Sequence, residues 1–295
     1  MAKLKELRVS AVNITNEHES AQIYYDAIYS AYENRLVHKY QGDHALVITS
    51  LPERKSDADE LPADIYGVFA RYTQIDVDGD WLNTQSLKLA TPSDKSSINI
   101  PENLKPNVSA FYFRFNLHSH KMIFEVYSSQ SKTLSQLKAK DFFLDILNQA
   151  PIRKEFGVFN VNIISSDDSL SSILDMHRIQ YIITEIERPN GDGVGNALER
   201  AEKNHKERLQ ALQAQRQKTE YKAMPGKSLK PDDLLKTEIY IASENGNAIV
   251  IGRDEEGKKV EKSLDEHPRV ESVKYDTELR LGQQAFDEAT DKFLK

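Results

Sequence analysis

Residues 110–127, AFYFRFNLHSHKMIFEVY, carry the strongest secondary-structure signal in the chain. Side chains alternate between the two faces of a strand, so apolar residues at every second position predict an antiparallel hairpin with one phenylalanine-rich buried face. The residues of the opposite side include Tyr112, Arg114 and Tyr127, an aromatic and basic combination typical of sheets that stack nucleic-acid bases. The alternating apolar residues are Phe111, Phe113, Phe115 and Leu117, followed by Met122, Phe124 and Val126.

Strand and helix signals alternate on both sides of this hairpin. Asn16-x-x-Glu19 is a helix-start pattern, and Thr133-x-x-Gln136 begins a second helix that ends near Pro151. A short helix from Asp167 separates two strands by enough chain for parallel pairing. The sequence therefore predicts an α+β fold with a mixed sheet flanked by helices, of which a ferredoxin-like core is one instance. The predicted strands outside the hairpin are 7–14, 45–51, 65–75, 158–164 and 179–187.

The character of the chain changes after Arg188. Three glycines, Gly191, Gly193 and Gly195, precede a polar stretch at 196–223 whose composition favours one long helix. Asn245-Gly246 is a tight-turn signal between strands of the segment 235–262. A strand at 269–275 and a helix at 283–294 follow. These changes predict a core domain over 1–190, a glycine-rich joint with a polar helix over 191–232, and a small C-terminal antiparallel β-meander plus helix over 233–295.

Charge is distributed unevenly along the chain. Lys and Arg number 39 against 46 Asp and Glu, giving a net charge of −7. The segment 203–230 carries eight basic residues and two acids, or +6, so the rest of the chain carries −13. The segment is either a partly exposed linker helix or a docking element for phosphate or for an acidic partner protein. Its basic residues are Lys203, Lys206, Arg208, Arg216, Lys218, Lys222, Lys227 and Lys230.

Two glycine-containing stretches are candidates for binding an anion. Gly191, Gly193 and Gly195 precede a helix, but the dinucleotide fingerprint lacks its third glycine in the expected place. Gly226-Lys227-Ser228 matches the end of a nucleotide-binding loop, although Tyr221 stands where that motif has its first glycine. A flexible joint and a helix stop explain these glycines equally well, and we predict no cofactor.

Metal-binding candidates lie at two places, and both have a simpler explanation. Asp76, Asp78 and Asp80 resemble the opening of a calcium loop, but Trp81 stands at the position that needs glycine. The pair His118 and His120 lies near the hairpin turn. An acidic surface turn and a polar turn are the alternatives. The aspartates begin the segment 76–109, which is either a functional loop or a connection with short unrecognised elements.

One loop contains the residue types of a metal-free ribonuclease. His38 and His44, with Lys39, Tyr40 and Asp43 between them, supply groups for general acid–base catalysis. Helix-end charge and capping explain the same residues. The chain has no cysteine, which excludes thiolate metal sites and cysteine nucleophiles.

Three stretches resemble an uncharacterised bacterial and phage family, known as a domain of unknown function. They are QGDHALVITSL at 41–51, IPENLKPNVSAFYFRFNLHSHKMIFEV at 100–126 and ITEIERPNGD at 183–192. The resemblance covers about the first two-thirds of the chain. It implies a prokaryotic or phage source and raises the prospect of a role in phage–host conflict. The family has no assigned activity, so no functional residue is transferred.

Together these observations predict a non-catalytic binding or regulatory protein. The basic 203–230 segment would engage nucleic acid or a partner subunit. A ribonuclease-type enzyme using the 38–44 loop, and a structural component that oligomerises through the long helix, are the alternatives. No stretch of the sequence is apolar for long enough to suggest a signal peptide or a membrane span, which predicts a cytoplasmic protein.

Overall fold

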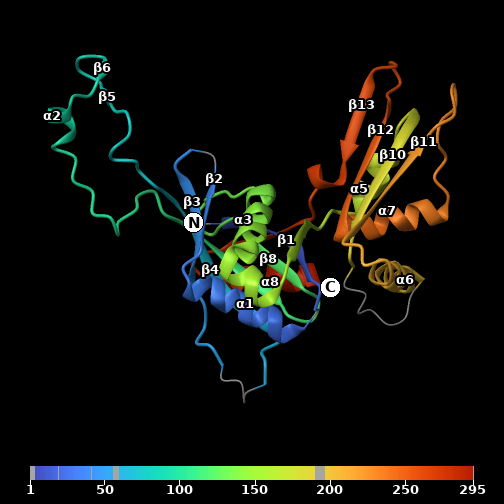
Figure 1. Ribbon diagram of the computed structural model, residues 1–295, viewed down its shortest axis with the longest axis horizontal. Coiled ribbons are helices and arrows are strands. Elements are labelled where there is room, and N and C mark those ends of the chain that lie inside the picture. Colours follow the sequence, from blue (N-terminus) through green and yellow to red (C-terminus); the bar gives the residue numbers. More distant parts are fainter. Residues whose placement is uncertain (1–3, 19, 41, 56–59, 190–196, 295) are drawn as a thin grey trace.

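Two antiparallel sheets form the two halves of the molecule, and a thin arm projects from the first half (Figure 1). The computed structural model describes residues 4–294 except 19, 41, 56–59 and 190–196. The predicted α+β class is confirmed. No helix in these ranges is long and apolar enough to cross a membrane.

The larger sheet has the order β14-β1-β8-β7-β4-β3-β2, and β9 also pairs with β1. One edge of β1 pairs with β14 over residues 4–10 and with β9 over residues 12–16, while the other edge pairs with β8. Its strands are β1 (Leu4–Asn16), β2 (Val37–Tyr40), β3 (His44–Ser50), β4 (Asp64–Thr73), β7 (Ser109–Asn116), β8 (Lys121–Tyr127), β9 (Phe159–Ile163) and β14 (Val270–Asp276).

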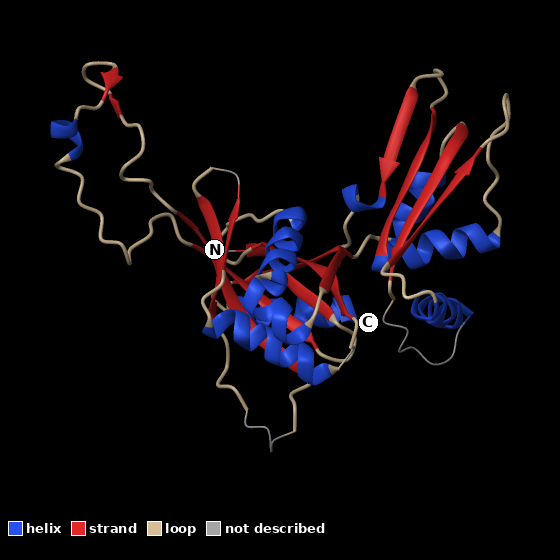
Figure 2. Cartoon of the chain, in the orientation of Figure 1, coloured by secondary structure: helices blue, strands red, loops and turns tan. Residues whose placement is uncertain are grey.

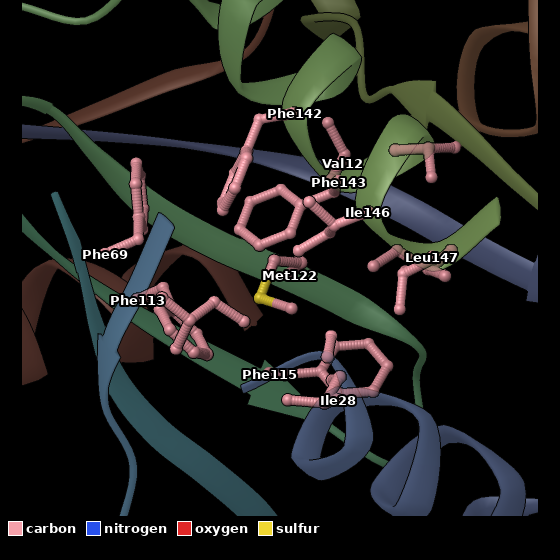
Figure 3. Packing of buried hydrophobic residues seen from close by; sticks show 14 of the residues in the cluster. Val12, Ile28, Phe69, Phe113, Phe115, Met122, Phe142, Phe143, Ile146 and Leu147 are labelled. Atoms are coloured by element: carbon pink, nitrogen blue, oxygen red, sulfur yellow. The ribbon is translucent and has the colours of Figure 1, made fainter. Parts of the chain in front are cut away.

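The predicted hairpin is confirmed as β7 and β8, with Phe113 opposite Phe124. Its phenylalanine face lies under three helices, α1 (Ala21–Glu33), α3 (Gln136–Asn148) and α4 (Ala150–Phe156). Figure 3 shows Phe142 and Phe143 of α3 among the residues of this core. Burial of large aromatic side chains is the main stabilising contribution here.

The opposite face of the hairpin is covered by α8 (Gly282–Leu294). The Tyr112 ring lies 5.8 Å from that of Phe286. The Arg114 guanidinium lies 2.8 Å from the Asp64 carboxylate and 2.6 Å from the Asp291 carboxylate. The expectation that Tyr112 and Arg114 form a base-stacking surface is therefore wrong, because a helix occupies it.

The second sheet has the order β11-β10-β12-β13. One of its faces packs on α5 and α7 through a separate aliphatic core that includes Ile182, Val250 and Ile239. The elements of this half are α5 (Asp167–Leu174), β10 (Arg178–Glu187), α6 (Ala197–Ala211), β11 (Arg216–Lys222), α7 (Asp233–Asn245), β12 (Gly246–Arg253), β13 (Lys259–Ser263) and the short 3-10 helix η1 (Leu264–Glu266).

Several expectations for the connections are wrong. All strand pairings among the described residues are antiparallel, so the predicted mixed sheet does not form. The strands on either side of the helix from Asp167, β9 and β10, lie in different sheets and do not pair in parallel. The segment 196–223 is not one helix, because its second half is β11, paired with β10. Asn245 ends α7 instead of forming a hairpin turn, and the residues before it are helical. The segment 233–295 is not a separate module, since β14 and α8 complete the first sheet and its core.

The segment after β4 forms the projecting arm (Figure 2). It contains the short strands β5 (Leu82–Asn83) and β6 (Lys88–Leu89) and the one-turn helix α2 (Pro92–Lys95). No residue between 76 and 108 is buried. The arm therefore contributes nothing to either core.

Candidate nucleic-acid interface

The face of the second sheet opposite α5 and α7 is lined by alternate residues of its four strands. On β12 these are Asn247, Ile249, Ile251 and Arg253, of which the two isoleucines are half-buried. The register places Tyr181 beside Ile251 and Ile183 beside Ile249. We call this surface the open face. Its centre is aliphatic with one tyrosine ring.

Cations gather at the end of the open face that is farther from the first sheet. Arg178 pairs directly with Arg253, and Arg253 pairs directly with Lys259 on the next strand. On β11, Lys222 pairs with Tyr181, and its ammonium lies 5.4 Å from the centre of the Tyr181 ring. We call Arg178, Tyr181, Lys222, Arg253 and Lys259 the basic end.

The row Arg178–Arg253–Lys259 is electrostatically unfavourable by itself. Like charges that face each other across antiparallel strands are destabilising. The Nε of Arg178 donates to the Lys227 carbonyl, and Nη1 of Arg253 donates to the Gly257 carbonyl. Both partners are neutral, so these hydrogen bonds position the guanidinium groups without compensating their charge. Two carboxylates share the centre of this face, Glu261 beside Ile251 and Glu220 beside Ile183.

The charges at the other end of the open face are balanced. Arg216 pairs with Glu187 in the register and lies 2.6 Å from the Glu185 carboxylate. Burial raises the pKa of Glu187, while a hydrogen bond from Asn162 of the first sheet lowers it. Lys218 pairs with Glu185 in the register. Cations at this end are therefore matched by carboxylates, whereas the strand residues of the basic end carry an excess of cations. The acids nearest to that end in the chain, Asp254, Glu255 and Glu256, lie in the turn between β12 and β13.

The structure divides the basic residues predicted from the 203–230 segment among three elements. Lys203, Lys206 and Arg208 lie on α6 and not on β11. Arg216, Lys218 and Lys222 lie on β11, and Lys222 alone among them belongs to the basic end. Lys227 and Lys230 lie in the connection between β11 and α7, where the Lys227 carbonyl holds Arg178.

Four of the five residues of the basic end were not predicted from the sequence, namely Tyr181 and three cations. Arg178, Arg253 and Lys259 are spread over 82 positions of the chain and become neighbours through strand pairing. Each is an ordinary charged residue at a strand end. The sequence did contain one signal, because Arg178 directly precedes one predicted strand and Arg253 ends another. To recognise the two arginines as neighbours, however, the register of β10 on β12 is needed.

The anion-loop candidates do not form a phosphate site in the described structure. Gly191, Gly193 and Gly195 lie outside the described residues. Gly226 adopts a positive φ of 78° in a turn, and the Ser228 hydroxyl accepts a hydrogen bond from the Ile179 amide. Four residues separate Ser228 from Asp233, where α7 begins, so this stretch does not lead directly into a helix as a nucleotide-binding loop does.

The residues predicted as metal ligands make local hydrogen bonds and ring contacts instead. One oxygen of Asp76 accepts hydrogen bonds from the amides of Asp78 and Gly79 at 3.1 Å. His120 is buried and its ring lies 4.4 Å from that of Tyr24, whereas His118 is exposed. Among the described residues, Asp80 and the other candidates form no group of three possible metal ligands.

The two histidines of the ribonuclease hypothesis lie on one hairpin, with Tyr40 near both. Nδ1 of His38 lies 3.0 Å from the Asp145 carboxylate on α3. The Tyr40 ring lies 5.9 Å from each histidine ring. His44 instead lines a cavity of 350 Å³ at the base of the arm, together with Asp43 and Asp76. The structure thus places His44 in the same cavity as Asp76, the first aspartate of the calcium-loop candidate. His38 instead contacts α3 through Asp145.

A cavity of 470 Å³ lies between the two halves of the molecule. Its lining is mainly polar and includes Thr15, Asn160, Arg188 and Gln215. The Thr15 hydroxyl is buried and has no hydrogen-bond partner among the described residues. None of the candidate catalytic, metal-binding or basic residues predicted from the sequence lines this cavity.

The model of the family DUF4747, a domain of unknown function, matches residues 5–291. The chain belongs to this family. The match extends over both sheets and the arm, and so over more of the chain than the first two-thirds expected from the resemblance. The DUF4747 region thus includes the whole basic end. No curated protein matches the sequence.

Proposed function

We propose that this DUF4747 protein is a non-catalytic protein that binds single-stranded nucleic acid at the basic end of the open face. The observation that carries the proposal is the row Arg178–Arg253–Lys259, in which three cations face one another on adjacent strands. Phosphate groups would relieve this repulsion and release counterions, which favours binding.

The chemistry of the neighbouring side chains fits an unpaired strand better than a duplex. Tyr181 offers a ring for stacking a base, and Ile183 and Ile251 offer an aliphatic floor beside it. Base stacking on an aromatic side chain contributes about 1–3 kcal/mol per base. Strands in a sheet lie about 4.8 Å apart, so the row of three cations spans about 10 Å, enough for a few successive phosphates. The carboxylates Glu185 and Glu187 at the opposite end of the open face would limit how far the bound strand extends in that direction.

The direct test is the affinity for fluorescently labelled single-stranded RNA and DNA, measured by anisotropy at about 50 mM salt, where phosphate contacts are strong. We expect the double variant Lys222→Glu, Arg253→Glu to lose at least about tenfold in affinity, because two attractive contacts become repulsive. The matched control is Lys203→Glu, Arg208→Glu, which makes the same charge change on the exposed side of α6. An equal loss in both double variants, or no binding by the unaltered protein, would overturn the proposal.

The enzyme alternative rests on one observation, the contact between His38 and Asp145. A carboxylate that orients a histidine is part of many general acid–base sites. The hypothesis predicts cleavage of RNA that is abolished by His44→Ala and His38→Ala. Cleavage that survives both substitutions would contradict it. The role in phage–host conflict and the cytoplasmic location remain predictions from the sequence.

A further inference from the structure

The arm between β4 and β7 is a separate structure attached at its base. Its base is closed by a hydrogen bond from the Thr73 amide to the Pro106 carbonyl. Between these points the hydrogen bonds of residues 76–105 join residues of the arm to one another, as in the bond from Trp81 Nε1 to the Asp76 carbonyl. The arm therefore has no polar attachment to the body along this length of the described chain.

The arm also exposes aliphatic side chains that nothing in this copy covers. Leu82, Leu87 and Leu89 near its tip are 60%, 76% and 69% exposed, and Leu104 and Val108 are exposed as well. A two-stranded hairpin alone is marginally stable in water. Ordering about 30 residues without burying any of them costs conformational entropy that the arm does not recover by itself. An exposed apolar group of this kind marks an interaction surface.

The charge of the arm selects among possible partners. Residues 76–105 contain five acids and three bases, a net charge of −2, and Asp76, Asp78 and Asp80 lie together near its base. This charge disfavours a nucleic acid as the occupant. It complements the basic end of the open face, where Lys222 and Arg253 border the aliphatic residues Ile249 and Ile251.

Figure 1 shows the arm and the second sheet at opposite ends of the molecule, with the first sheet between them. The arm therefore cannot reach the open face of its own chain. We propose that the arm of one copy docks on the open face of a second copy, with Leu82 and Leu89 on the aliphatic centre. Such a contact joins two different surfaces, so it forms a closed ring or a chain of copies, or a reciprocal pair.

Docking of the arm and binding of nucleic acid use the same face, so one excludes the other on a given copy. Self-association is independent of the proposed function, because it is measured without nucleic acid. Addition of single-stranded nucleic acid is expected to dissociate the assembly if both proposals hold.

The test is the mass in solution, measured by light scattering over a range of protein concentrations. The arm variant Leu82→Asp, Leu89→Asp changes exposed side chains only, so it keeps the fold and is expected to stay monomeric. The face variant Lys222→Glu, Arg253→Glu is expected to stay monomeric too. The control Leu279→Asp removes an equally exposed leucine outside the arm, and it is expected to assemble like the unaltered protein.

Mixing the two monomeric variants makes the test specific. The face variant still has an intact arm, and the arm variant still has an intact open face. The mixture is expected to form a pair of one copy of each, whereas contact between two arms would let the face variant assemble with itself and leave the arm variant monomeric. A monomeric unaltered protein at all concentrations, normal assembly of either variant, or a mixture that stays monomeric would each overturn the proposal.

Discussion

Replacement of Glu125 by glutamine should make the stability of the protein less dependent on pH. Glu125 lies on β8 under α8 and is 1% exposed. Burial raises its pKa to about 7, and hydrogen bonds from the Tyr112 and Ser129 amides oppose the rise. The hydroxyl of Tyr275 shares this environment, since burial and then the charge of Glu125 raise the pKa of that tyrosine.

The direction of this pH dependence follows from the difference in the pKa of Glu125 between the folded and unfolded states. The folded protein holds the Glu125 proton up to a pH of about 7, whereas the unfolded chain releases it near the ordinary value of 4.5. The contribution of Glu125 to the free energy of unfolding is therefore fully present below pH 4.5, falls as the pH rises, and reaches its minimum above pH 7. The loss is about 3 kcal/mol in total, and most of it falls between pH 5 and pH 8.

The assay is urea denaturation of the unaltered protein and of Glu125→Gln at pH 5 and pH 8. The amide has one acceptor oxygen, so it leaves one of the two backbone donors unsatisfied at a cost of about 1–3 kcal/mol at both pH values. That cost cancels in the difference between the two pH values. We expect the variant to gain about 2–3 kcal/mol relative to the unaltered protein on going from pH 5 to pH 8. A change below about 0.5 kcal/mol would refute the assignment of a buried, proton-binding carboxyl.

Three further predictions concern the two cores and the basic end. Phe143→Ala should lower the free energy of unfolding in urea by about 3–5 kcal/mol, because its ring packs against four other phenylalanines; a loss under about 1 kcal/mol would show that the site is loosely packed. Gly246→Ala should destabilise the second sheet, because its methyl group would overlap the Glu185 carbonyl oxygen; an unchanged melting temperature would contradict the tight approach of β12 to β10. Lys259→Gln should raise stability at low salt by about 0.2–1 kcal/mol while it weakens nucleic-acid binding; a clear loss of stability would mean that the row of cations is not repulsive.

Local periodicity predicted the first half of the fold well. The alternation of Phe111, Phe113 and Phe115 places them all in the core, as expected. Periodicity is less decisive on α3, where Leu137 and Leu144 are exposed while Phe142 and Phe143 are buried. A helix with apolar residues on more than one side has two possible inward faces, and packing against the sheet chooses between them.

The second half was harder to predict because its strands are stabilised by their partners. Residues 216–222 contain four charged side chains and little apolar alternation, yet they form β11 because the open edge of β10 accepts them. In α7, Ile239 and Ile241 resemble strand alternation, but Leu235, Ile239 and Ala242 follow helical spacing, and all four residues are buried. Short apolar runs are ambiguous in this way.

The candidate site was found only in part from the sequence. The excess of basic residues between 203 and 230 indicated a cationic element, and Lys222 proved to belong to the basic end. Arg178 and Arg253 became visible only through the pairing of β10 with β12. Register depends on contacts over long separations in the chain, which composition and spacing do not encode.

The salt dependence of binding to a labelled single strand tests the central claim most directly. Each phosphate contact to a single strand contributes about −0.7 to the slope of log K against log salt, so the four cations of the basic end predict a slope of about −3. Lys259→Gln should reduce the magnitude of the slope by about 0.7. Absence of binding at low salt, or a slope that stays the same in the Lys259→Gln variant, would contradict the assignment of the basic end as the nucleic-acid interface.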